Sequence, residues 1–172
     1  MEKENVQKKD LKTNKKVMPP DEYFRLLKGF DIKDIYLTSC NYSVDKNKFG
    51  SNPESSIDIS LETNTSFKLE ESKKGATFIV NNNLVGKNKN EDSNVIDIKT
   101  TYELYFISSE EINNEFLSIY SEISLPLNIF PYFREFMQNL TIRSGISPIV
   151  LPLARGFGKP FKMDSVQTKD NP

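Results

Sequence analysis

The side chains that most often carry out catalysis are scarce in this chain of 172 residues. It contains no histidine, which excludes Ser-His and Cys-His nucleophile systems and every metal site that uses histidine. The single cysteine, Cys40, lies among polar residues of a predicted strand, where a lone cysteine usually serves only packing. We therefore predict that the protein is not an enzyme and that it binds no metal ion and no cofactor.

Carboxylate pairs can act as a general acid and a general base, so we considered each of them. Pairs such as Asp31 with Asp34, Glu70 with Glu71, and Glu110 with Glu111 lie in predicted turns or on polar strand faces. Solvation is the ordinary explanation for acidic residues in such places. Residues 156–160 (GFGKP) lack the Gly-x4-Gly-Lys-Ser/Thr spacing of a phosphate-binding loop. None of these motifs predicts an active site.

Charge and hydropathy exclude two further classes of partner. The formal net charge is −1, and the basic residues do not gather with aromatic ones, so we expect no nucleic-acid partner. No run of about 18 apolar residues occurs, so we expect no membrane insertion. Residues 1–16 lack the apolar core of a secretory signal, and a single cysteine fits a reducing compartment. We therefore expect a cytoplasmic protein.

Four segments alternate apolar and polar side chains with the period of a β-strand. They span about 31–42, 57–70, 76–84 and 96–106, and the second alternates without interruption. In the first strand, strict alternation predicts Ile35 and Leu37 on one face of the sheet. It places Tyr36, Cys40 and Tyr42 on the other face.

A long amphipathic helix is predicted from Asn128 to Ser144. Asn128 is a good N-cap, Pro131 would fall in the first turn, and Gly145 can end the helix in the left-handed conformation. Its apolar residues recur at spacings of three and four: Ile129, Phe133, Phe136, Met137 and Leu140. A second, short helix is predicted from Asp21 towards Gly29, ahead of the first strand.

The composition changes at both ends of the chain. Residues 1–17 hold six lysines, three acidic residues and few aliphatic ones, which is too little apolar surface to order the segment. The last residues show little periodicity. We predict a flexible basic N-terminal tail (1–18), one domain (19–155) and a flexible C-terminal tail (156–172).

The predicted long helix and the apolar segment after it resemble a known family. Residues 128–135 (NIFPYFRE) and 144–151 (SGISPIVL) are similar to the signature of the SecB protein-export chaperones. The resemblance implies an α+β fold, in which a four-stranded antiparallel sheet is packed by the long helix. It also implies a homotetramer, a dimer of dimers joined across first-strand edges, that holds unfolded or precursor polypeptides.

The resemblance implies a set of client-binding residues. In that family an apolar trio of the second strand lines the client groove, which here corresponds to Ile57, Ile59 and Leu61. Further candidates lie in the crossover loop and after the helix: Tyr42, Phe49, Ile149 and Leu151. The alternative for each is packing in the core, which is the commoner fate of alternating apolar strand residues.

The helix itself is the predicted oligomer interface, through Phe133, Phe136, Met137 and Leu140. A wide apolar arc suits contacts on two sides, although a helix buried in a monomer would look the same. The family's proteobacterial members are acidic and dock on the SecA motor, whereas this chain is nearly neutral. Service to one dedicated partner, such as an antitoxin, is therefore an alternative to export. A structural assembly protein and a small-molecule-binding domain are two further alternatives.

Overall fold

The computed structural model describes residues 18–48, 57–88, 93–151 and 161–166. A short helix leads into four long strands, two helices and one last strand. In chain order these are α1 (Pro20–Leu27), β1 (Phe30–Val44), β2 (Ile57–Leu69), β3 (Gly75–Asn88), β4 (Asn94–Ser108), α2 (Asn114–Ile123), α3 (Leu125–Arg143) and β5 (Phe161–Val166).

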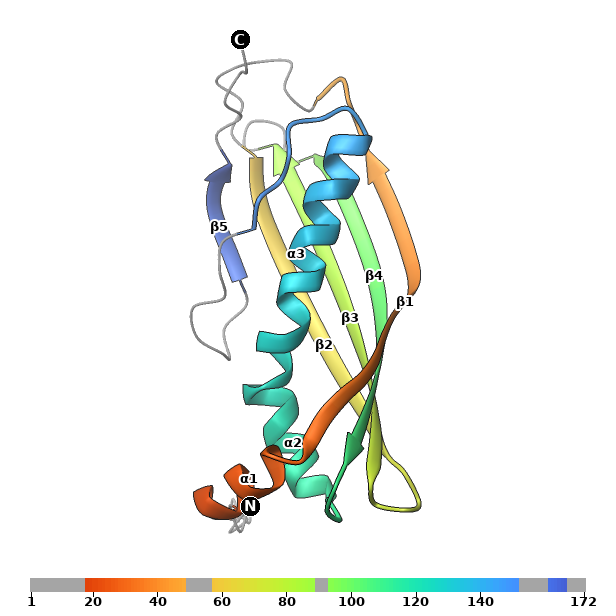
Figure 1. Cartoon of the computed structure of the whole chain (residues 1–172). Helices are drawn as coiled ribbons and strands as arrows, with labels where there is room; N and C mark the ends of the chain where they lie inside the picture. The colour runs from red at the N-terminus through yellow and green to blue at the C-terminus, as the bar shows by residue number, and fades with distance from the viewer. Residues whose placement is uncertain (1–17, 49–56, 89–92, 152–160, 167–172) are drawn as a thin grey trace, which may run out of the picture.

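The strands form a single antiparallel sheet with the order β1-β4-β3-β2-β5. All three helices lie on one side of it, and α3 runs along the sheet (Figure 1). The four predicted strands and the long helix are confirmed. The fifth strand was not predicted: β5 lies in a segment with little periodicity and pairs with the first half of β2, Ile57–Leu61.

Strand β1 does not keep the alternation that its sequence predicts. The pairing of β1 with β4 shifts register between Ile32 and Asp34 and again between Leu37 and Ser39. Each bulge adds one residue to β1 and reverses the faces of the residues beyond it. Cys40 and Tyr42 therefore lie on the helix side with Ile35 and Leu37, opposite Thr100 and Ile98, so the prediction that put them on opposite faces was wrong.

An aromatic cluster joins the lower half of the sheet to α2. The ring of Tyr120 lies 4.9 Å from Phe30, 5.3 Å from Phe106, 5.7 Å from Phe78 and 5.9 Å from Phe116, measured between centroids. Its hydroxyl accepts a hydrogen bond of 2.7 Å from the Asn128 amide, and burial raises the pKa of the phenol. This cluster fixes the position of α2, and hence the start of α3, over the sheet.

The helical region differs from its prediction at its beginning. Helix α2 was missed, although Asn113 caps it by accepting a hydrogen bond of 2.8 Å from the Phe116 amide. Helix α3 begins at Leu125, one turn earlier than predicted, with a proline at its start. Asn128 is therefore not the N-cap, and Pro131 lies inside the helix rather than in its first turn.

One polar row crosses the otherwise apolar helix side of the sheet. The Thr63 hydroxyl donates to Asn82 Oδ1 at 2.8 Å, and Asn82 Nδ2 donates to Thr100 Oγ1 at 3.3 Å. Asn82 and Thr100 are buried, so these hydrogen bonds satisfy groups that would otherwise be costly to bury.

Candidate functional site

The predicted client trio lies in the core of the folded chain. Ile57, Ile59 and Leu61 are at most 5% exposed and belong to the main hydrophobic cluster. Ile149 and Leu151 are fully buried in the same cluster. In the single chain these five residues pack against other core side chains and are almost inaccessible to solvent. Their role in client binding therefore stays a prediction. It requires the segment that covers them to move.

That cover is the segment that comes after α3. It turns back at Gly145 (φ 71°) and runs down the sheet between α3 and β2 (Figure 1). The hydroxyl of Thr141, which is buried, accepts a hydrogen bond of 3.1 Å from the Ile149 amide. Thr141 also donates to the Met137 carbonyl at 2.9 Å. The Thr141 hydroxyl thus attaches the segment to α3, together with the hydrogen bond from the Ile146 amide to the Thr141 carbonyl at 3.3 Å.

The predicted interface residues of α3 divide into two groups. Phe133 and Met137 lie on the buried row that faces the sheet, together with Leu125, Ile129 and Thr141. Phe136 and Leu140 are half-buried at the border of that row. Only these two have surface left to contact another molecule without a rearrangement of the fold.

Uncovered apolar side chains gather where α3 faces the β1 edge. Glu135 lies near enough to Tyr102 of β4 to affect its pKa, so the side of α3 that carries Tyr132, Glu135 and Phe136 faces β4 and β1. Tyr132 is 51% exposed, and Leu37 of β1 is 40% exposed. We define the β1 surface by the residues that these two elements contribute: Ile32, Ile35, Leu37, Cys40, Tyr42, Tyr132 and Phe136.

Two buried hydroxyl groups at the β1 surface have no hydrogen-bond partner among the described residues. They belong to Tyr42 and Tyr102. Burial, with smaller contributions from the neighbouring Cys40 and Glu135, raises the pKa of Tyr102 to about 12. A buried hydroxyl without a partner costs free energy, so a rearrangement that opened these two groups to a carbonyl or amide of a ligand would recover part of that cost.

Of the two remaining candidate residues, the structure describes only Tyr42. Tyr42 is half-buried and lies on the helix side. Phe49 lies outside the described residues. Leu37 was not a candidate, since its exposure follows from the place of β1 at the sheet edge, which the alternation alone does not show. Tyr42 and Phe136 of this surface were candidates from the sequence, and Tyr132 extends the apolar arc of α3.

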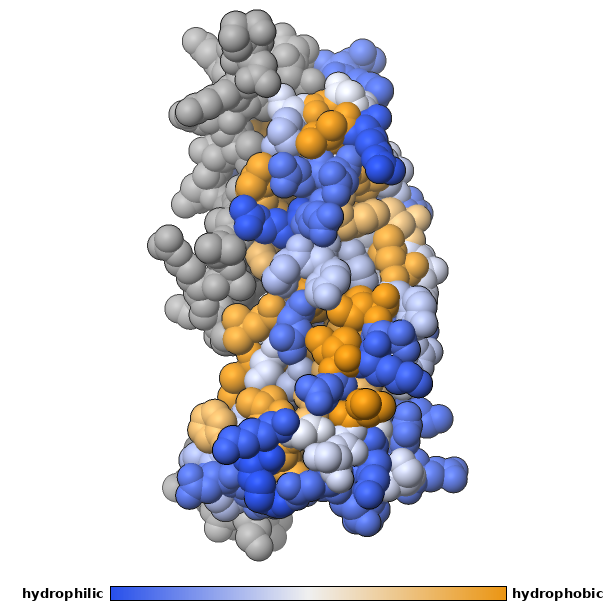
Figure 2. Space-filling view, viewed as in Figure 1, coloured by the Kyte–Doolittle hydropathy of each residue, from blue (hydrophilic) through white to orange (hydrophobic). Residues whose placement is uncertain are grey.

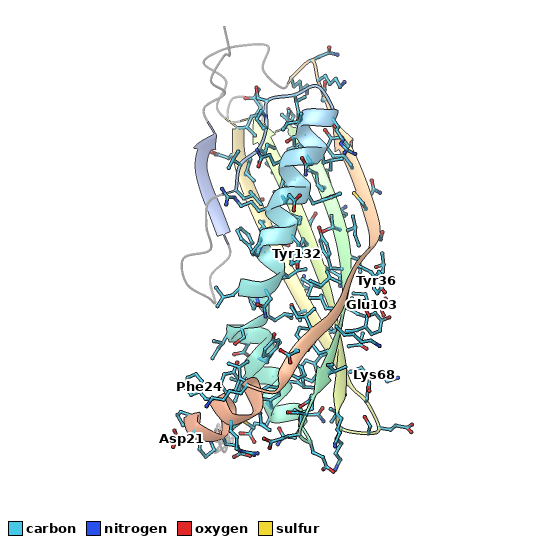
Figure 3. All side chains as sticks on the ribbon, in the orientation of Figure 1. Asp21, Phe24, Tyr36, Lys68, Glu103 and Tyr132 are labelled. Carbon is cyan, nitrogen blue, oxygen red and sulfur yellow. The ribbon has the colours of Figure 1, made fainter. Side chains whose placement is uncertain are left out.

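Within the part of the chain that the structure describes, the opposite face of the sheet carries no helix and is mostly polar. The Tyr36 and Tyr105 rings meet edge to face at 5.9 Å, and the Tyr105 hydroxyl donates to Glu103 at 2.6 Å. Figure 3 shows Tyr36 and Glu103 on the side of the sheet away from α3. The hydrogen bond to Glu103 raises the pKa of Tyr105.

A polar pocket of about 470 Å³ lies at one end of the sheet. It opens to solvent and is lined by residues from the end of β1, the turn after it and the start of β4, such as Ser43, Asp45, Asn94 and Asp97. It does not lie between the sheet and the helices, where a small-molecule-binding domain of this build would need it. Among the described residues no three acidic or cysteine side chains are placed to hold a metal ion. Within the same residues, no helix has the length and hydropathy to cross a membrane.

Comparison with solved structures identifies the fold. The SecB-like chaperone Rv1957 of Mycobacterium tuberculosis, in complex with a ChAD peptide from the antitoxin HigA1 (Rv1956), matches with a TM-score of 0.65 at 19% identity. The match covers 76% of this chain and 95% of that chain. The SecB-like α+β fold that the sequence resemblance implied is confirmed.

Other comparisons add little. A protein of unknown function from Streptococcus agalactiae matches with a TM-score of 0.40 at 11% identity, over 72% of this chain and 97% of that one. No family model matches the chain. No curated protein matches it either.

Proposed function

We propose that this protein is a SecB-like chaperone that binds non-native polypeptide and keeps it soluble, without catalysis and without a cofactor. The observation that carries the proposal is an uncovered apolar surface on a SecB-like fold. Side chains of β1 and α3 that would be buried in an ordinary core remain exposed there.

The chemistry of the β1 surface suits an unfolded chain. Leu37, Tyr132 and Phe136 offer apolar and aromatic contact without a shaped pocket that would select one side chain. The Tyr42 and Tyr102 hydroxyls are buried in the single chain, so they can hydrogen-bond the backbone of a client only after the side chains around them move. Such a surface binds many sequences weakly and in extended form.

The structure of Rv1957 with an antitoxin peptide favours service to a dedicated partner as one version of this function. Holding precursor polypeptides for export, with handover to SecA, is the other version. The net charge of −1 provides no strong acidic field for docking a basic motor segment, so we place the dedicated-partner version first. In both versions we propose a homotetramer, a dimer of dimers that limits the apolar surface open to aggregation but leaves Leu37, Tyr132 and Phe136 accessible to a client.

A structural assembly protein is the second candidate function. The same β1 surface would then be covered by another copy of the chain and would be closed to any client. Accessibility in the assembled protein separates the two functions.

The test is suppression of aggregation of a chemically unfolded model polypeptide, followed by light scattering, with the assembly state measured by size exclusion. The variant Leu37→Ser/Tyr132→Ser removes two apolar side chains, each of which is about half exposed and can contact a client. Each contributes about 1 kcal/mol. Their combined loss weakens holding roughly thirtyfold.

The matched control carries Ile79→Ser and Ile107→Ser on the polar face of the sheet, where both side chains are similarly exposed. The control is expected to hold clients as well as the unaltered protein. Equal losses in both variants, with assembly intact, would mean that holding does not use the β1 surface. Absence of suppression by the well-folded, unaltered oligomer would refute the general chaperone and leave the dedicated-partner version or the assembly protein.

A further inference from the structure

Strand β2 has an open edge over half its length. Along one side it pairs with β3 from Ile57 to Leu69. Along the other side it pairs with β5 only from Ile57 to Leu61. Among the described residues nothing pairs with this side of β2 beyond Leu61. Eight residues, 62–69, therefore present an edge about 27 Å long at the rise of an antiparallel strand.

The direction of the free backbone groups follows from one hydrogen bond. The Glu70 amide donates to the Gly75 carbonyl at 3.0 Å, which makes residue 70 a hydrogen-bonded partner of β3. In an antiparallel ladder such pairs alternate, so the even-numbered residues of β2 bond to β3. The amide and carbonyl groups of Thr63, Thr65 and Phe67 therefore point out of the sheet edge.

The surroundings of this edge can receive the side chains of an added strand. Thr63 and Thr65 lie on the helix side but are exposed, so space remains above them. Helix α2 packs against β2. Leu127, in the first turn of α3, is 53% exposed. Ile123, one turn before Leu127, is 49% exposed. Hydrophobic side chains are visible along the border of the helical layer that faces β5 (Figure 2).

Strand β5 shows that this edge accepts a strand. It is a separate segment of the chain that pairs antiparallel with β2, directly next to the open part. The other outer edge of the sheet, on β1, is interrupted by two bulges. The β2–β3 ladder has no register shift, and the one irregularity of the β2–β5 pairing lies between Ile57 and Ile59, outside the open part. A regular edge suits a continuous backbone partner, and bulges are a usual protection against one.

We propose that the edge of β2 from Thr63 to Phe67 binds an extended polypeptide segment by antiparallel β-pairing, in line with β5. This inference rests on the proposed function and adds its binding mode. Backbone hydrogen bonds to three alternate residues hold the segment, independent of its sequence. Its apolar side chains on the helix side contact Ile123 and Leu127. Its other side chains lie beside the polar Asn64 and Ser66.

The test compares Thr65→Pro with Thr65→Ala. Proline removes the outward amide and its ring blocks the approaching strand, and an edge position tolerates it because the bonds to β3 come from residues 64 and 66. Alanine removes the same side chain but keeps the amide. The probe is a fluorescently labelled peptide of about ten residues in which Val and Leu alternate with Ser and Lys, a length that one strand can pair. We expect Thr65→Pro to weaken its binding about tenfold or more, and Thr65→Ala to bind like the unaltered protein.

A second measurement on the unaltered protein covers the case in which Thr65→Pro fails to fold. The amides of Thr63, Thr65 and Phe67 are expected to exchange with solvent more slowly once the peptide is bound. Binding with equal affinity by both variants, or with no added protection at these amides, would overturn the edge proposal and leave the proposed function in place. Failure of the unaltered protein to bind the peptide, while it still holds unfolded polypeptide, would overturn the edge proposal alone. Failure to bind the peptide and to hold any unfolded polypeptide would overturn the edge proposal and the general chaperone together.

Discussion

The variant Thr141→Val tests how the segment after α3 is held over the sheet. Valine has nearly the shape of threonine and is equally β-branched, so packing and helix propensity change little. The loss is the hydroxyl that accepts the Ile149 amide at 3.1 Å, where both residues are fully buried. A buried amide left without a partner costs about 1–3 kcal/mol. For a chain of this length, a cost of about 2 kcal/mol lowers Tm by about 4–8 °C.

The substitution should first increase local opening of the segment after α3, before the whole domain unfolds. With this hydrogen bond removed, the buried side chains of Ile149 and Leu151 still hold the segment, but local openings that expose Ile57 and Ile59 should become more frequent. Calorimetry gives Tm, binding of an apolar dye reports the exposed surface, and hydrogen exchange reports the Ile149 amide. Thr141→Ser is the control, since it keeps the hydroxyl and loses one methyl group, about 1 kcal/mol. A Thr141→Val protein as stable as the unaltered one, with Ile149 still protected, would refute the reasoning.

Three further predictions concern other parts of the fold. Gly86→Ala should lower the free energy of unfolding by about 1–3 kcal/mol in urea titrations, because the new Cβ would lie 2.4 Å from the Ile96 side chain; unchanged stability would show that the sheet yields there. Coupling a bulky maleimide to Cys40, the single cysteine and an exposed one, should abolish client holding, whereas full activity after complete labelling would exclude the β1 surface. Burial raises the pKa of Tyr102 in the folded protein to about 12, from 10.0 for a free tyrosine. The buried phenol is stable in its neutral form. Its contribution to the free energy of unfolding is therefore complete below pH 10 and is lost as the pH rises through 12. Ultraviolet titration of the phenolates measures this, and a Tyr102 that ionises with the exposed tyrosines would contradict it.

The sequence predicts well where one period continues without interruption. The alternation from Ile57 to Leu69 predicted β2 and its two faces, and the three-and-four spacing predicted the buried row of α3. Bulges leave no mark in composition, so the faces of β1 beyond Thr38 were predicted wrongly. Helix α2 had a usable signal in Asn113 followed by Phe116, Leu117 and Tyr120, and it was missed beside the stronger pattern of α3.

The candidate site was harder to predict because exposure depends on distant segments. Alternation shows that Ile57, Ile59 and Leu61 share an apolar face. It does not show that Ile149 and Leu151, some 90 residues later, close over it. Leu37 and Tyr132 are apolar in sequence like many core residues. Only the position of β1 at the edge of the sheet leaves them uncovered. Strand β5 is equally a tertiary effect, since a six-residue segment gains its structure from the edge of β2.

The row formed by Thr63, Asn82 and Thr100 has a consequence for how the sheet assembles. A shift of one strand by two residues would keep every apolar side chain on the helix side, so hydrophobic burial alone distinguishes such slipped pairings poorly. It would, however, move Asn82 opposite Leu61 or Thr65 of β2, or opposite Ile98 or Tyr102 of β4, and break its present hydrogen bonds to Thr63 and Thr100. The three polar side chains thus favour the native register of β2, β3 and β4. Sheets with a shifted register are less stable during folding because these hydrogen bonds are lost.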